Sequence, residues 1–178
     1  MKEEVFNGIK YQLDEEILTA DVIENVDRER KIDIPEVVVF NEVSYRVTRI
    51  KVEGFSGYSS LTSITIPNSV TEIGARAFAN CHKLTDITIP DSVTSIGERA
   101  FLWCFSLNTV TIPNSVTTVG KRAFSGCGLT SITIPDSVTS IGEGTFLDCE
   151  SLEEVVIGNS VTSIGVEAFC RCEMLTDI

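Results

Sequence analysis

The sequence predicts an α/β repeat protein in which short strands and single helical turns recur along a solenoid. One segment, LTSITIPNSVTEIGARAFANCHK, begins at residue 61 and is restated almost to the end of the chain. The leucines that open each copy recur every 22 or 23 residues, at Leu61, Leu84, Leu107, Leu129, Leu152 and Leu175. Repeats of this length are single supersecondary units that stack on one another, and no unit is stable alone.

Each copy begins with a predicted strand. Leu61, Ile64 and Ile66 follow the spacing L-x-x-I-x-I, which turns apolar side chains inward and alternate residues outward. Pro67 ends this strand because proline has no amide hydrogen to give to a ladder. Asn68 and Ser69 then form a corner.

The second half of a copy is predicted to turn back toward the next strand. Val70 and Ile73 point inward from a second extended segment, and Gly74 is expected to take a positive φ at a tight bend. Ala77, Phe78 and Cys81 have the spacing of one helical turn that packs inward. The phenylalanines of this turn should form an interior row at Phe55, Phe78, Phe101, Phe124, Phe146 and Phe169.

The N-terminal region carries no copy of the repeat. Residues 9–13 alternate apolar and polar side chains, an acidic break follows, and residues 17–23 are again largely apolar, which predicts a β-hairpin. We expect residues 1–34 to form a cap over the end of the solenoid core. A divergent first repeat follows over residues 35–60, and the regular repeats occupy residues 61–178.

The last repeat is incomplete. The sequence stops at residues 175–178, within the first strand of a new copy. An uncapped terminal strand can pair with another chain. This predicts self-association through that strand, a longer parent protein, or both.

Composition excludes some partners. A net charge of −12 at pH 7 and a pI near 4.5 argue against nucleic acid, because phosphate contacts require a basic face. No apolar run approaches the roughly 20 residues that span a bilayer, so membrane insertion is not expected. The first residues lack the features of a secretory signal, which leaves a cytoplasmic protein or a removed signal as alternatives.

Five cysteines occupy the same repeat position: Cys81, Cys104, Cys127, Cys149 and Cys172. Such a column suits buried free thiols better than disulfides. Cys170 lies outside the column and should be more accessible. Together with Cys149 and Cys172 it superficially resembles a metal cluster, but the paired C-x-x-C spacing of strong zinc sites is missing, so no metal is expected.

Catalytic chemistry is not indicated. The single histidine, His82, lies on a turn beside the cysteine column, and the carboxylates are scattered along the chain. Glycine-rich phosphate loops are absent from the sequence. We therefore expect no catalytic residues and no cofactor.

The pattern L-T-x-I-T-I-P-x-S-V-T-x-I-G-x-x-A-F-x-x-C resembles the 23-residue leucine-rich repeats of the BspA-like, Treponema pallidum type. The resemblance covers residues 61–178 and implies a right-handed solenoid with a parallel sheet along one face. It also implies adhesion and protein binding at a bacterial surface, and hence a surface or secreted location. The motif consists of core positions, so it identifies no functional residues.

The outward positions of the predicted sheet are the first candidate binding surface. They are Ser63, Thr65, Asp86, Thr88, Thr109, Thr111, Ser131, Thr133, Glu154 and Val156. Repeat proteins often use such faces as extended recognition platforms. The alternative is that threonine simply suits a strand with one face in water.

A second candidate surface is an apolar anchor formed by Leu102, Trp103 and Phe105, where other repeats have small or polar residues. Exposed aromatic residues often anchor interfaces. Alternatively, they cover a gap left by the next repeat, which is one residue shorter. The sequence thus favours a non-enzymatic module that binds a protein or glycan partner, and the alternative is a structural spacer within a larger repeat protein.

Overall fold

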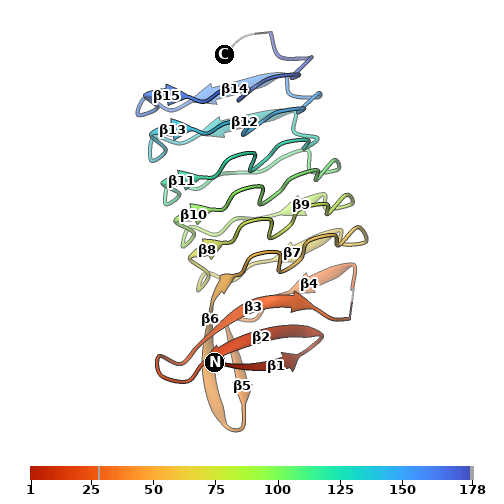
Figure 1. Ribbon diagram of the computed structural model, residues 1–178, viewed down its shortest axis with the longest axis vertical. Coiled ribbons are helices and arrows are strands. Elements are labelled where there is room, and N and C mark those ends of the chain that lie inside the picture. The colour runs from red at the N-terminus through yellow and green to blue at the C-terminus, as the bar shows by residue number, and fades with distance from the viewer. Residues whose placement is uncertain (28, 177–178) are drawn as a thin grey trace.

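The computed structural model describes residues 1–27 and 29–176. The chain winds through a stack of flat coils, from an antiparallel sheet at the N-terminus to the last coil near the C-terminus (Figure 1). Residues one repeat apart become neighbours in adjacent coils, because Ser63 pairs with Asp86 and Ile64 with Ile87. The terminal strand expected at the C-terminus includes residues 177–178, which lie outside the described residues.

Two ladders of short parallel strands run along the stack, side by side in Figure 1. The first ladder contains the L-x-x-I-x-I strands: β4 (Lys31–Asp33), β7 (Ser63–Thr65), β9 (Asp86–Ile87), β12 (Ser131–Ile134) and β14 (Glu154–Ile157). The second ladder contains the end of β6 (Val43–Ile50), β8 (Glu72–Ile73), β10 (Ser95–Ile96), β11 (Thr118–Val119), β13 (Ser140–Ile141) and β15 (Ser163–Ile164), with a break in the pairing between β11 and β13. Residues 109–112 lie outside these strands and interrupt the first ladder.

The N-terminal region is a sheet whose strands are β1 (Lys2–Phe6), β2 (Ile9–Asp14) and β3 (Thr19–Asn25). The expected hairpin is β2 and β3, and β1 is an additional antiparallel strand that the sequence analysis missed. β3 joins the solenoid by pairing in parallel with β6. Within the divergent repeat, β5 (Val37–Phe40) pairs with β6 as a second antiparallel hairpin.

The expected helical turns are wrong, and with them the α/β class, because residues 1–27 and 29–176 contain no α-helix. Each Ala-Phe-x-x-Cys segment is instead a series of tight turns. Arg76 and Asn80 have φ of 54° and 62°, which a right-handed helix excludes. Alternate amides in this segment bond to the next coil, as from Phe78 N–H to the Ala100 carbonyl at 2.7 Å. These bonds between coils replace the bonds that a helix would form within one coil.

The glycine that precedes each of these turns also differs from expectation. Gly74 does not have the positive φ that the sequence analysis assigned to it. A Cβ built on Gly74 would lie 2.7 Å from the carbonyl carbon of Lys51 in the preceding coil. Glycine is therefore needed here because adjacent coils approach closely at this position.

The interior row of phenylalanines is confirmed. Successive rings from Phe55 to Phe169 stack with centroids 5.2 to 5.8 Å apart and interplanar angles of at most 9°. The five leucines from Leu61 to Leu152 that open the repeats are fully buried. Each buried side chain of this size stabilises the fold by roughly 1.5–3 kcal/mol.

The cysteine column lies beside the phenylalanine row. Each column thiol is buried and donates its S–H to the phenylalanine carbonyl of the preceding coil, as from Cys104 to Phe78 at 3.2 Å. Burial raises the pKa of Cys81, Cys127 and Cys172 above the ordinary value and that of Cys149 to about 12. These thiols therefore act as core side chains. Cys170 is exposed, as the sequence predicts.

Candidate functional site

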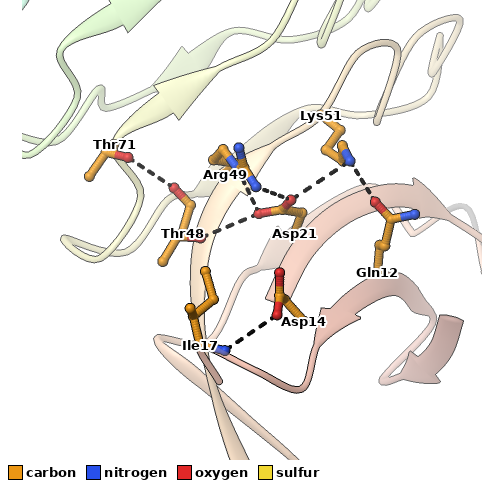
Figure 2. Close-up of polar contacts among 8 residues, drawn as sticks. All are labelled: Gln12, Asp14, Ile17, Asp21, Thr48, Arg49, Lys51 and Thr71. Carbon is orange, nitrogen blue, oxygen red and sulfur yellow. Dashed lines mark hydrogen bonds and ion pairs between the residues drawn. The ribbon is translucent and has the colours of Figure 1, made fainter. Parts of the chain in front are cut away.

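The most buried carboxylate among the described residues belongs to a structural ion pair. Asp21, 5% exposed, accepts hydrogen bonds from Arg49 Nε at 3.0 Å and Arg49 Nη2 at 2.8 Å (Figure 2). Thr48 Oγ1 lies 3.3 Å away, and Lys51 lies between Asp21 and Gln12. The network connects β3 of the N-terminal sheet to β6 of the first coil. The sequence analysis did not identify this ion-pair network, although Asp21 stands out as a charged residue in a largely apolar segment.

The candidate positions on the first ladder do form one surface. Nine of the ten lie on its strands or on the interrupting segment, Thr88 directly follows β9, and all of them alternate with buried residues such as Ile64 and Ile87. Ser63 is half-buried and the other nine are exposed. We call this surface the sheet face. It includes Thr109 and Thr111, which keep their outward orientation although their segment is not a strand.

Two kinds of threonine are distinguished by their hydroxyl groups. Thr71, Thr94 and Thr117 directly precede strands of the second ladder, and each donates a hydrogen bond to the threonine carbonyl one coil back, at 3.2 to 3.4 Å. On the sheet face, Thr88 and Thr111 differ, because among the described residues neither hydroxyl has a hydrogen-bond partner. The hydroxyls of Thr65 and Thr133 likewise have no hydrogen-bond partner among the described residues.

The sheet face contains two shallow hollows, of about 520 and 510 Å³. The larger lies where the first ladder is interrupted and is lined by Thr109, Thr111 and Thr133. Asp91 lines both hollows, and Asn114 lines the larger. The sequence analysis placed the matching residue of the first regular copy, Asn68, at a corner and not at a site. The signal was an Asn or Asp directly after the proline in four copies, at Asn68, Asp91, Asn114 and Asp136.

The aromatic anchor is only partly buried. Trp103 is 46% exposed and Phe105 is 57% exposed, while Leu102 is half-buried. Trp103 has φ of 59°, a left-handed conformation that costs an L-residue with a bulky side chain roughly 1–2 kcal/mol. The same position of the next coil is Gly126, which adopts φ of 68° without that cost. An exposed, strained tryptophan therefore stands where glycine suits the backbone.

The neighbouring coil makes room for this anchor. A Cβ at Gly126 would collide with Cδ1 of Trp103, and a Cβ at Gly128 would collide with the Phe105 carbonyl. Phe105 stacks on the other side against His82, with ring centroids 5.1 Å apart. The rings of Trp103 and Phe105 thus cover part of the short repeat, and about half of each residue's surface remains exposed to solvent.

Acidic side chains lie on the far side of the glycines. Trp103, Phe105, Gly126, Asp148 and Glu150 line a hollow of about 460 Å³. Arg171 also lines it, and its Nη1 lies 3.4 Å from Oδ1 of Asp148. Sequence reasoning identified the aromatic wall but missed the acidic one, which lies two repeats further along the chain.

Within residues 1–27 and 29–176, no three His, Cys, Asp or Glu side chains are grouped as metal ligands. The same part of the chain contains no helix with the length and apolar character to cross a membrane.

Family and structural comparisons agree with this geometry. The model of the BspA type leucine-rich repeat region matches six copies, over residues 38–104 and 71–178. A search of curated proteins finds no match.

Several solved structures have the same fold. A leucine-rich repeat protein from Bacteroides ovatus is 37% identical with a TM-score of 0.91, over 97% of this chain and 45% of that protein. A leucine-rich cell surface protein from Faecalibacterium prausnitzii is 32% identical with a TM-score of 0.84, over 100% of this chain and 54% of that protein. The Treponema pallidum leucine-rich repeat protein is 26% identical with a TM-score of 0.77, over 99% of this chain and 92% of that protein.

The chain thus spans about half the length of the Bacteroides and Faecalibacterium proteins. The repeat motif, the matching family model and the shared coil geometry lead to one conclusion. This chain belongs to the BspA-type leucine-rich repeat family.

Proposed function

We propose that this chain is a non-enzymatic interaction module that presents its sheet face to a protein or glycan partner. The observation that carries the proposal is the difference between the two threonine columns. On the second ladder, the hydroxyls form bonds between coils. On the sheet face, hydroxyls such as those of Thr88 and Thr111 are exposed and free to bond with a ligand.

The shape and chemistry of the sheet face support such a partner. Its two hollows present hydroxyl, amide and carboxylate groups from Thr109, Asn114 and Asp91. These groups can donate and accept hydrogen bonds, which suits the hydroxyls of a glycan or the backbone of an extended peptide. Leucine-rich repeat proteins are in general protein-interaction modules, which also favours this function.

We also propose a location at a bacterial cell surface. The Faecalibacterium relative is described as a cell surface protein, and all of this chain aligns with about half of that protein. A non-enzymatic role is supported by the internal pairing of Asp21 with Arg49 and by the stacking of His82 on Phe105.

The alternative is a structural spacer, which the regular stacking of coils favours. In that case threonine occupies the sheet face because β-branched residues suit an exposed strand. The spacer and the interaction module differ in whether the sheet face binds anything.

The test replaces Thr88, Thr111 and Thr133 together by lysine and measures binding to arrays of purified extracellular-matrix proteins and glycans. We expect the parent chain to bind at least one array component and the triple variant to lose that signal while keeping its circular dichroism spectrum.

A matched control adds the same three charges to the second ladder, at Thr118, Ser140 and Ser163, which are also exposed. This control should bind as the parent does. Equal binding by both triple variants would remove the sheet face as the site, and no binding by the parent would favour the spacer.

A further inference from the structure

We propose that the hollow between Trp103 and Phe105 on one side and Asp148 and Glu150 on the other binds a lysine or arginine side chain from a basic segment of a partner protein. We call it the aromatic–acidic hollow. It deepens the proposed function by adding a second binding surface with defined chemistry. It lies on the turn segments and not on the sheet face, so the two surfaces can be tested separately.

The register of the coils builds this hollow. Trp103 and Asp148 occupy the same repeat position two coils apart, and Phe105 and Glu150 occupy another. The coil between them contributes Gly126 and Gly128 at these two positions, so its side chains leave the space open. Phenylalanine rings of the three coils are separated by 5.2 Å and 5.8 Å, which sets the two walls two coil spacings apart.

The two walls match the two parts of a basic side chain. Lysine and arginine have an apolar stem that packs against aromatic rings and a cationic head that remains polar. A cation within about 6 Å of an indole ring is attracted to its face. Carboxylates on the opposite wall can form charge-assisted hydrogen bonds with that cation.

The chain itself shows that the acidic wall accepts a guanidinium. Arg171 reaches back one coil and places Nη1 3.4 Å from Oδ1 of Asp148. Its side chain is 73% exposed, so it remains at the rim. Among the described residues, Glu150 has no ion-pair partner and is free to pair with an incoming cation.

Charge distinguishes a basic segment from a neutral sugar, which could also stack on exposed aromatic rings. The carboxylates of the hollow do not contribute charge pairing to a neutral ligand. The net charge of −12 further attracts a basic partner and speeds its association at low ionic strength. The structure therefore favours the basic segment.

The test uses Trp103, the single tryptophan of the chain, as a fluorescent reporter. The probes are end-capped pentapeptides in which glycine alternates with arginine, lysine or glutamate. At low salt, we expect Trp103 fluorescence to change and reach a plateau as the concentration of the arginine or lysine peptide rises. The glutamate peptide should leave the fluorescence unchanged. Chitotriose serves as the neutral sugar.

Two variants locate the site. Asp148→Asn with Glu150→Gln keeps the shape of the wall and should weaken peptide binding by at least about tenfold, or about 1.4 kcal/mol. The control, Glu15→Gln with Glu16→Gln, removes the same charge from an exposed turn outside both proposed surfaces and should bind as the parent does. Trp103→Gly, which suits the left-handed backbone, should retain the fold and lose binding of a fluorescently labelled arginine peptide in an anisotropy assay.

Three outcomes would overturn the proposal. The first is unchanged basic-peptide affinity when Asp148 and Glu150 are neutralised, and the second is no response of the parent to either basic peptide. The third is saturable binding of chitotriose that exceeds that of the basic peptides, which would identify the hollow as a sugar platform. None of these outcomes bears on the sheet-face proposal, whose variants leave this hollow intact.

Discussion

Replacing Phe124 by alanine tests whether the stacked coils share one continuous core. The Phe124 side chain is fully buried between Phe101 and Phe146, with centroids 5.2 Å and 5.8 Å away. Truncation of a buried phenylalanine costs about 3–5 kcal/mol, because transfer energy is lost and a cavity remains. We expect the upper part of this range, since two stacked pairs, each contributing about 0.5–1.5 kcal/mol, are lost together.

The assay is urea denaturation followed by circular dichroism, with Phe169→Ala as the matched control. Phe169 is half-buried and stacks on Phe146 alone among the described phenylalanines, so its loss should cost at least about 2 kcal/mol less. The reasoning is refuted if Phe124→Ala costs under about 1 kcal/mol, or no more than Phe169→Ala.

Three further predictions concern the turn segments and the thiols. Gly126→Ala should lower the free energy of unfolding more than Gly57→Ala. Both glycines have positive φ, but only the alanine at 126 would collide with Trp103; equal losses in urea denaturation would contradict this. Cys170 should be the one thiol that reacts rapidly with Ellman's reagent in the native chain, and rapid labelling that persists in Cys170→Ser would contradict its unique exposure. Burial raises the pKa of Cys149 from 9.0 to about 12, so its contribution to stability is complete below pH 9 and is lost as pH rises toward 12. The loss of stability between neutral pH and about pH 10 should therefore be smaller in Cys149→Ala than in the parent, and an identical loss would argue against the buried thiol.

The sequence predicted the columns of the core well, because each depends on a side chain that repeats at one spacing. Phe78, Leu84 and Cys104 are buried where the repeat places them. The strand that begins each copy also followed from its alternation of Ile64 and Ile66 with polar residues. Stacking in register is a direct consequence of the repeat, so these features required no knowledge of distant contacts.

The turn segments could not be predicted in the same way. The spacing of Ala77, Phe78 and Cys81 fits a helix, and only the bonds between coils make tight turns the better solution. Those bonds run to a neighbouring repeat and leave no local pattern. Residues such as Arg76 at positive φ also gave no signal, since arginine rarely takes this conformation.

The candidate surfaces were predicted in part. The sheet-face residues could be named from alternation, but their free hydroxyls could not, because Thr71 and Thr88 are the same residue and each lies directly beside a short strand. What separates them is a carbonyl in the adjacent coil, which Thr71 reaches. The acidic wall of the aromatic–acidic hollow was missed for a related reason, since Asp148 faces Trp103 across a coil of glycines.

The central claim is that the free hydroxyls of the sheet face serve binding while those of the second ladder serve the fold. The most direct test removes only hydroxyls, with valine at Thr88, Thr111 and Thr133 in one variant and at Thr71, Thr94 and Thr117 in the other. For each variant, the free energy of unfolding and binding to the array component recognised by the parent are measured together.

We expect the first variant to keep its stability and lose binding. The second should lose about 1–2 kcal/mol of stability, because three hydrogen bonds between coils are removed, and keep binding. Binding that survives in the first variant, or stability that survives in the second, would contradict this division of roles.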